Sequence, residues 1–321
     1  MVPLFLAEER NSKCRRLPHP PGARVVHLVS EFAGANKRIN LTRKTVIVLR
    51  EAHRSRVMRK EFNGARGSIV ADERRFDRLR RYNIVMGFFH LVQGIAIVAL
   101  SNDFTLPVTA SLLAGPPGTP PAAPTILFDV PLGLAVATFI FMSALAHFII
   151  ASPPVYPWYV KNLKLNRNYA RWIEYTFSSS LMVVLIGMLP GVFDVAAIIA
   201  IFGANASMLL FGLLMEHYEE PGNPNWMSFI FGCLTGIVPW LAIGIYIWSP
   251  GSAAEPPAFV YLIFVTMFIF FNSFAVNMVL QYKKIGPWSD YLYGERTYVL
   301  LSLVAKSLLA WLVFANTLIP T

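Results

Sequence analysis

The chain has 321 residues, of which 55% are hydrophobic and only 14% are charged. These proportions exclude an ordinary soluble domain and indicate a protein that crosses the bilayer several times. Most of the basic residues behind the formal net charge of +10 lie before position 82, so that charge says little about the membrane part. The two cysteines, Cys14 and Cys233, predict no disulfide framework, and we expect Cys233 to be a small buried residue.

Residues 1–70 are rich in Arg and Lys and contain no long apolar run. This composition predicts a basic, disordered N-terminal extension in front of a membrane domain formed by residues 71–321. One interpretation is a cytoplasmic tail that contacts anionic lipid. Another is that the natural product begins near Met58. The stretch 71–81 combines helix formers with dense positive charge, and we expect it to be a helical lead-in to the first span.

Seven apolar segments follow, and they predict an all-α, seven-helix membrane bundle. They cover about residues 82–100, 131–151, 170–189, 193–215, 226–248, 258–280 and 297–319. The first connection is rich in Pro and Gly, and its β-capable pieces at 106–110 and 125–130 predict a small extracellular hairpin. The connection 152–168 carries three prolines, and we expect it to be irregular.

The charges beside the spans predict the orientation of the chain. Beyond Arg81, every Lys and Arg except Lys306 lies beside the second or the sixth connection, whereas the first, third and fifth connections have none. Basic residues stay on the cytoplasmic side. We therefore expect a multi-pass protein of the cell membrane with a cytoplasmic N-terminus and an extracellular C-terminus.

One charged side chain, Lys306, lies near the middle of the last span. A lysine at that depth costs about 2.5–3.5 kcal/mol on insertion scales, and such a residue normally has a partner and a function. Glu174 is the only acidic residue of the third span, which runs in the same direction as the last, so a Lys306–Glu174 pair is within reach. The alternative is an interfacial ion pair between Glu174 and Arg171 with no cofactor.

Other polar residues occur inside the apolar segments. A lone buried histidine is usually structural, but His90 and His147 together with Glu174 suggest a polar cavity that accepts a proton. Their spacing predicts no metal site. Ser302 lies four residues before Lys306 and therefore on the same helix face. The aromatic residues of the fifth and sixth spans either pack helices or line a flat apolar pocket.

The amino-acid sequences of three stretches give a more specific indication of the protein family. Residues 171–182, residues 301–311 and the tetrapeptide Asn205-Ala-Ser-Met208 closely resemble heliorhodopsin, a family of retinal-binding seven-helix proteins with an inverted membrane orientation. The resemblance extends from about Arg78 to the C-terminus and leaves out the N-terminal extension. It implies all-trans retinal bound covalently to Lys306 as a Schiff base, with Glu174 as the sole counterion and Ser302 near the imine.

The same resemblance implies roles for further residues. His90 and His147 match the histidines of a cavity on the counterion side. Met208 and Trp240 flank the chromophore, and Phe271 is a further lining residue. Tyr175 and Asn205 belong to the surrounding polar network. The family also forms dimers and has a hairpin in its first connection.

The predicted function is that of a light-absorbing, photosensory or signalling protein without enzyme activity or ion pumping. We expect its partners to be retinal, membrane lipid, a second copy of the chain and an unidentified cytoplasmic signalling protein, and we expect no nucleic acid. A proton pump is disfavoured because Ser302 and the stretch around Leu185 stand where microbial pumps carry carboxylates. A light-gated proton conductance and a seven-helix transporter or receptor without a chromophore remain as alternatives.

Overall fold

The computed structural model describes residues 43–120, 122–249 and 255–319. Its first helix, α2, runs from Arg43 to Leu100, so the predicted lead-in at 71–81 is helical and continuous with the first span. The predicted extension covers residues 1–70. Its first 42 residues lie outside the described part of the chain, and the rest belongs to α2. The chain divides into one unit at Met1–Ser68 and a second at Ile69–Thr321, and everything below concerns the second unit.

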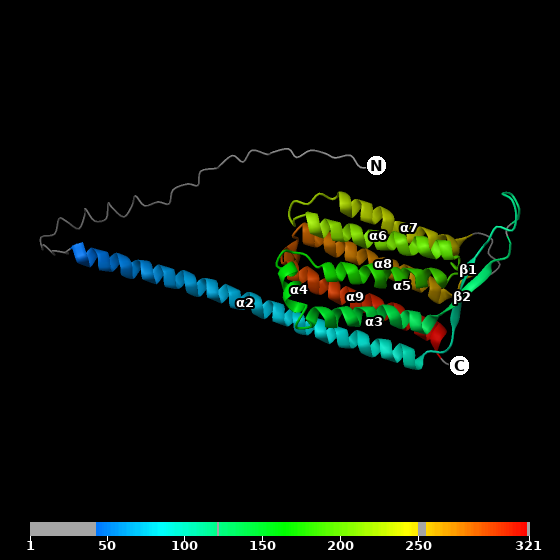
Figure 1. Ribbon diagram of the computed structural model, residues 1–321, viewed down its shortest axis with the longest axis horizontal. Coiled ribbons are helices and arrows are strands. Elements are labelled where there is room, and N and C mark those ends of the chain that lie inside the picture. Colours follow the sequence, from blue (N-terminus) through cyan, green and yellow to red (C-terminus); the bar gives the residue numbers. More distant parts are fainter. Residues whose placement is uncertain (1–42, 121, 250–254, 320–321) are drawn as a thin grey trace. The chain divides into compact units, whose positions relative to one another are not determined.

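Within the described residues, seven helices form the membrane bundle, as the sequence predicts (Figure 1). They are α2 from Asp72 onward, α3 Leu132–Ala151, α5 Tyr169–Met188, α6 Val195–Tyr218, α7 Met227–Trp248, α8 Ala258–Tyr282 and α9 Tyr291–Val313, which continues into a π-helical turn at Phe314–Leu318. Six of the described helices are long and apolar enough to cross a membrane by composition alone. The seventh, α5, has 20 residues but carries Arg171, Glu174 and three serines, which make it more polar.

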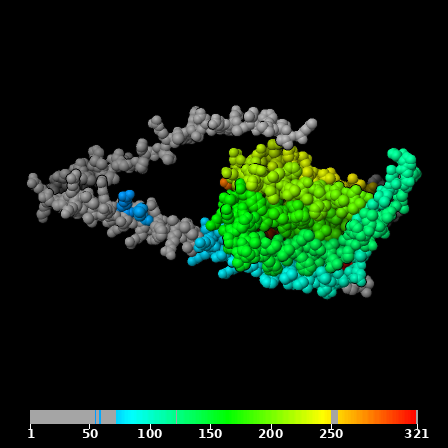
Figure 2. Space-filling model, viewed as in Figure 1, coloured from blue at the N-terminus to red at the C-terminus, as the bar shows by residue number. Residues whose placement is uncertain are grey.

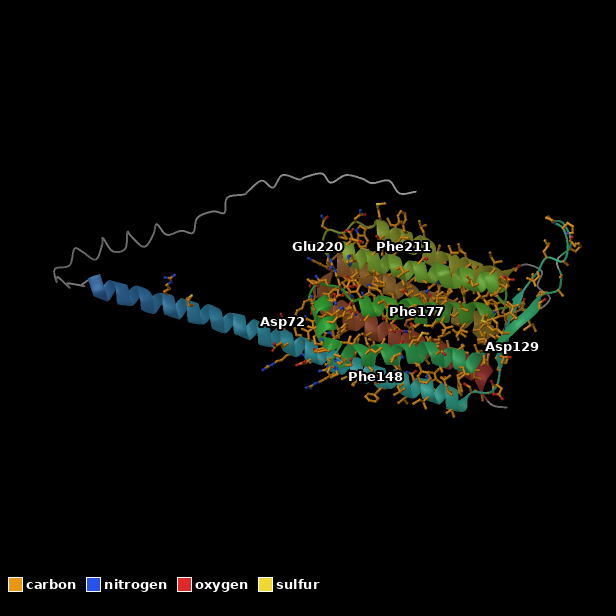
Figure 3. All side chains as sticks on the ribbon, in the orientation of Figure 1. Asp72, Asp129, Phe148, Phe177, Phe211 and Glu220 are labelled. Carbon is orange, nitrogen blue, oxygen red and sulfur yellow. The ribbon has the colours of Figure 1, made fainter. Side chains whose placement is uncertain are left out.

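One end of the bundle differs from the sequence expectation. The connection 152–168, expected to be irregular, contains the helix α4 Tyr156–Leu163. Pro157 fits the first turn because the N–H that proline lacks would have no helical partner there. Tyr159 and Leu163 are buried in a cluster with Phe76 of α2, so apolar packing stabilises the helix despite the prolines of this connection. We call this the α4 end; Glu220 lies at it in Figure 3, and Asp129 lies at the other.

The opposite end carries the predicted hairpin and is called the hairpin end. Strand β1 Thr105–Ala110 pairs antiparallel with β2 Thr125–Pro131, with an irregularity between Val108 and Thr109. The Thr109 N–H donates to the Phe193 carbonyl over 2.8 Å, which joins the hairpin to the connection between α5 and α6. Figure 2 shows the hairpin segment in blue-green at the edge of the packed helices.

Two helix-level expectations need correction. Helix α9 begins at Tyr291 rather than near Thr297, because the Asp290 carboxylate accepts the Leu292 N–H over 3.1 Å and so caps an additional helical turn. Cys233, expected to be buried, is exposed on α7. Its side chain is on the lining of the apolar cavity described below, where a small apolar thiol costs little.

Candidate functional site

The amine of Lys306 lies at the centre of a buried polar group. Its Nζ donates to Ser143 Oγ over 2.5 Å, to Glu174 Oε1 over 2.8 Å and to Ser302 Oγ over 3.1 Å. Ser143 Oγ in turn donates to Glu174 Oε1 over 2.7 Å. The side chains of Lys306 and Glu174 are 3% and 9% exposed. Each charge therefore depends on the other, since breaking a buried pair from one side leaves an uncompensated charge.

Three helices hold this group in place. Lys306 and Ser302 lie four residues apart on α9, and Glu174 lies near the start of α5. Asn168 fixes that start, because its Oδ1 accepts the Arg171 N–H over 3.1 Å. Ser143 of α3 was not predicted from the sequence, since a lone serine in an apolar run often bonds its own helix backbone. Ser143 could have been identified from its position four residues before His147, because this spacing places both side chains on the same helix face.

The two predicted histidines lie together beside this group. Their rings stack with centroids 5.7 Å apart and an interplanar angle of 16°. His147 Nδ1 is 2.8 Å from the side-chain oxygen of Asn83, which the sequence analysis did not identify. His90 is fully buried, and neither of its ring nitrogens has a polar partner among the described residues.

A small polar cavity separates the Lys306–Glu174 pair from the α4 end. Of the two histidines, only His147 lines it. Other side chains on its wall come from five helices and from the residue that caps α5: Asn83, Ser143, Tyr159, Asn168, Arg171, Glu174, Tyr175 and Ser302. The cavity predicted from His90, His147 and Glu174, and its proton-accepting role, stay predictions.

A second, mostly apolar cavity adjoins the amine of Lys306 on the other side. Its lining comes from α5, α6, α7, α8 and α9 and includes Trp172, Tyr175, Met182, Met208, Leu209, Phe271, Phe274 and Ser302. A primary amine on the wall of an apolar cavity suits a long hydrocarbon that carries an aldehyde, because the amine condenses with the aldehyde and the cavity buries the hydrocarbon. The residues present therefore fit retinal.

Not all predicted lining residues reach that cavity. Tyr175, Met208 and Phe271 do. Trp240 instead packs edge-on against Phe271, with ring centroids 5.4 Å apart, and lines a separate groove on α7 and α8.

Asn205 lies behind the cavity wall and supports α5. It is fully buried, and its Nδ2 donates to the hydroxyls of Ser179 and Ser180 over 2.9 and 3.0 Å. Of these two serines, Ser179 also lines the apolar cavity. Asn205 is therefore connected to the cavity through α5.

The interfacial ion pair between Arg171 and Glu174 that the sequence left open is wrong. Arg171 donates to Glu216 Oε1 over 2.7 Å and to Glu295, while Glu174 pairs with Lys306. Glu216 was expected in a polar connection, but α6 continues to Tyr218 and buries it. Glu295 lies in the unpredicted first turns of α9. A sequence reading that began this span at Thr297 could not place it inside the bundle.

Further donors complete what we call the Arg171 cluster, formed by Arg171, Glu216 and Glu295. The Tyr291 hydroxyl donates to Glu216 over 2.9 Å, and the Asn168 amide donates to Glu295 over 2.6 Å. The cluster joins α5, α6 and α9 at the α4 end. Tyr298 connects it to the site, because the Arg171 guanidinium lies 3.8 Å above the Tyr298 ring and Tyr175 Oη donates to the Tyr298 carbonyl over 3.0 Å.

Most of the buried polar groups lie between Lys306 and the α4 end. Among the described residues, no buried polar or charged side chain precedes Ser143 on α3 or Asn205 on α6, and none follows Ser180 on α5 or Lys306 on α9. These are the limits toward the hairpin end. Beyond them the helices pack through a continuous apolar core that includes Leu185, Ile186, Met188, Ile243, Ile263, Leu309 and Val313.

The fold and the site define a retinal-binding, seven-helix rhodopsin. The model of the heliorhodopsin family matches residues 79–318, and the chain belongs to that family. Its cofactor is therefore covalently bound all-trans retinal. The resemblance in the sequence is thereby confirmed.

A solved structure shows the same fold. The crystal structure of a light-driven proton pump from Leptosphaeria maculans is similar over 74% of this chain and 94% of that one, with a TM-score of 0.53 and 17% sequence identity. Identity this low supports the fold alone. No curated protein matches the chain.

Proposed function

We propose that this protein is a photosensory heliorhodopsin that signals without pumping ions or catalysing a reaction. One observation carries the proposal: beyond the level of Ser180 and Asn205, the described helices have an apolar core toward the hairpin end with no buried polar side chain. A pump needs polar or ionisable groups in series on both sides of the site. The Arg171 cluster and the small polar cavity supply groups for one side, and the apolar core at the hairpin end offers no continuation.

The residues around Lys306 have separate roles in this proposal. When bound, retinal supplies absorption of visible light and a change of shape on isomerisation. Lys306 provides the point of attachment, and Glu174 neutralises positive charge at its nitrogen. Ser143 and Ser302 orient that pair through the hydrogen bonds described above. His90 and His147 provide the region that takes up a proton on the Glu174 side.

The proposed orientation places the α4 end in the cytoplasm. Lys161 and Lys164 are exposed at this end, and Lys283 and Lys284 follow α8 there. Basic connections stay on the cytoplasmic side of a membrane. The Arg171 cluster then lies between the retinal site and the face that meets a cytoplasmic signalling partner. That partner and the homodimer implied by the family remain predictions.

The test uses cells that express the full chain with added retinal. We expect a visible absorption band, and we expect illumination to cause no change of external pH that a protonophore abolishes. A light-driven, protonophore-sensitive pH change would overturn the proposal in favour of a pump. Absence of any visible band would instead favour a transporter or receptor without a chromophore.

A further inference from the structure

The side chain of Asn83 has its orientation fixed by the backbone of its own helix. Its Nδ2 lies 2.9 Å from the Leu79 carbonyl oxygen. A carbonyl oxygen only accepts hydrogen bonds, so the nitrogen of the amide must face it. The opposite orientation would place two oxygen atoms against each other at that distance. Asn83 Oδ1 is therefore the atom that faces His147 Nδ1, at 2.8 Å.

This orientation fixes the tautomer of His147. An amide oxygen cannot donate, so the short contact requires the hydrogen to lie on Nδ1 of the histidine. In a neutral imidazole the other nitrogen, Nε2, then carries the lone pair. Asn83 is 1% exposed and belongs to α2, whereas His147 belongs to α3, so water does not compete freely for this contact.

The surroundings favour His147 over His90 as the group that accepts a proton. Protonated His147 would keep its bond to Asn83 and lies in the field of Glu174, which also lines the small polar cavity. The other charged or titratable groups near it are His90 of α2 and Lys306 of α9, and Tyr159 of α4 and Arg171 and Tyr175 of α5 line the same cavity. A second proton on His90 would create an N–H donor for which the described residues supply no acceptor.

The position of His147 also connects it to the amine. Ser143 accepts from Lys306 Nζ and lies four residues before His147, so both side chains occupy the same face of α3. His90 has no such neighbour among the polar groups that contact Lys306.

We propose that Asn83 is a positioning residue that holds His147 as the Nδ1–H tautomer, so that His147 Nε2, rather than His90, accepts the proton that leaves the Lys306 nitrogen after illumination. The N–H bond at Lys306 breaks, an N–H bond forms at His147 Nε2, and no electrons are transferred. The inference rests on the proposed light-dependent function, but it concerns a tautomer that exists in the dark.

The test is solid-state NMR of the full chain with retinal, labelled with ¹⁵N-histidine and kept dark in a lipid bilayer. The His147 signals are those lost in His147→Asn. We expect them to show a protonated Nδ1 and an unprotonated Nε2. An Nε2–H tautomer in the unmodified protein would overturn the proposal without the need for any variant at position 83. Transport assays do not affect this result, so it can fail independently of the photosensory proposal.

Two matched variants extend the test. Asn83→Leu removes the acceptor at similar volume and should release His147 from the Nδ1–H tautomer. After illumination, protein whose Lys306 nitrogen has lost its proton should absorb at shorter wavelength, and we call it the blue-shifted species. Asn83→Leu should also lower the yield of this species about tenfold, in line with the loss of one buried hydrogen bond. Asn83→Asp keeps an acceptor oxygen and should retain the tautomer and most of the yield.

A third variant separates the two histidines. His90→Phe should leave the His147 Nδ1–H tautomer in place, and it should lower the yield of the blue-shifted species less than Asn83→Leu does. If His90→Phe removes that species while Asn83→Leu changes neither the tautomer nor the yield, His90 is the acceptor and the proposal is wrong.

Discussion

The α4 end and the hairpin end of this bundle are built from the same kind of apolar helix, yet their interiors differ. At the α4 end, α5, α6 and α9 meet through three buried charges, those of Arg171, Glu216 and Glu295. At the hairpin end the core side chains are apolar, and Ile243 and Leu309 are almost fully buried among them. This difference supports the proposal that the polar groups around Lys306 continue toward one end of the bundle only.

Loss of the amine gives the largest expected effect. Lys306→Ala should produce colourless protein, because no primary amine remains to bind retinal, and Lys306→Arg should do the same although it keeps the charge. Absorption spectroscopy of the purified variants measures this. Ile243→Ala, at the hairpin end, is the control: it should lower stability by about 2–5 kcal/mol through a cavity but keep the colour. A coloured Lys306→Ala protein would remove Lys306 from the site.

Loss of the charge on Glu174 should have the next largest effect. Glu174→Gln removes the negative charge that stabilises the protonated form at the Lys306 nitrogen, so the visible band should disappear at a lower pH than in the unmodified protein. Each pH unit of displacement corresponds to about 1.4 kcal/mol of lost interaction. Glu174→Asp keeps the charge and should shift the titration less. If Glu174→Gln titrates like the unmodified protein, the compensating charge lies elsewhere.

The Arg171 cluster should matter more for stability than any exposed ion pair. Arg171→Gln leaves Glu216 and Glu295 buried together without their cation, and we expect a loss of about 3–5 kcal/mol in resistance to denaturation by detergent. The matched control is Arg75→Gln, which breaks a half-exposed pair with Asp290 at 2.5 Å. That variant should lose less than about 1 kcal/mol. Equal losses of stability in Arg171→Gln and Arg75→Gln would show that burial does not make the Arg171 cluster more important than an exposed ion pair.

These residues also show what the sequence can predict. The seven spans, the hairpin and the pairing of Lys306 with Glu174 follow from hydropathy, turn composition and the cost of a charge in the membrane. Ser143, Asn83 and Glu295 do not, because their importance comes from residues on other helices. Glu216 was assigned to a loop, since a charged residue at the end of an apolar run has no sequence signal for a partner such as Arg171. Tertiary contacts decide each of these cases.

The smallest expected effect concerns Tyr159 of α4. Burial, and next the nearby charge of Glu295, raise the pKa of its hydroxyl above the ordinary value of 10.0. The unfolded chain therefore loses this proton first as the pH rises, and stability should fall above about pH 10 by up to about 1.4 kcal/mol per pH unit for this group. Tyr159→Phe should flatten that decline and change little at pH 8. Thermal unfolding of both proteins at pH 8 and above about pH 10 measures this difference in stability. Parallel pH profiles of the two proteins would contradict the raised pKa of Tyr159.

In the proposed function, the polar route from Lys306 reaches one membrane face only. The most direct measurement is the electrical response to continuous light of the full chain with retinal, oriented in vesicles attached to a planar membrane. The structure predicts a transient displacement of charge at the onset of light, which decays to zero and stays at zero when a protonophore is added. A current that persists throughout illumination would show a route through the hairpin end and would contradict the account.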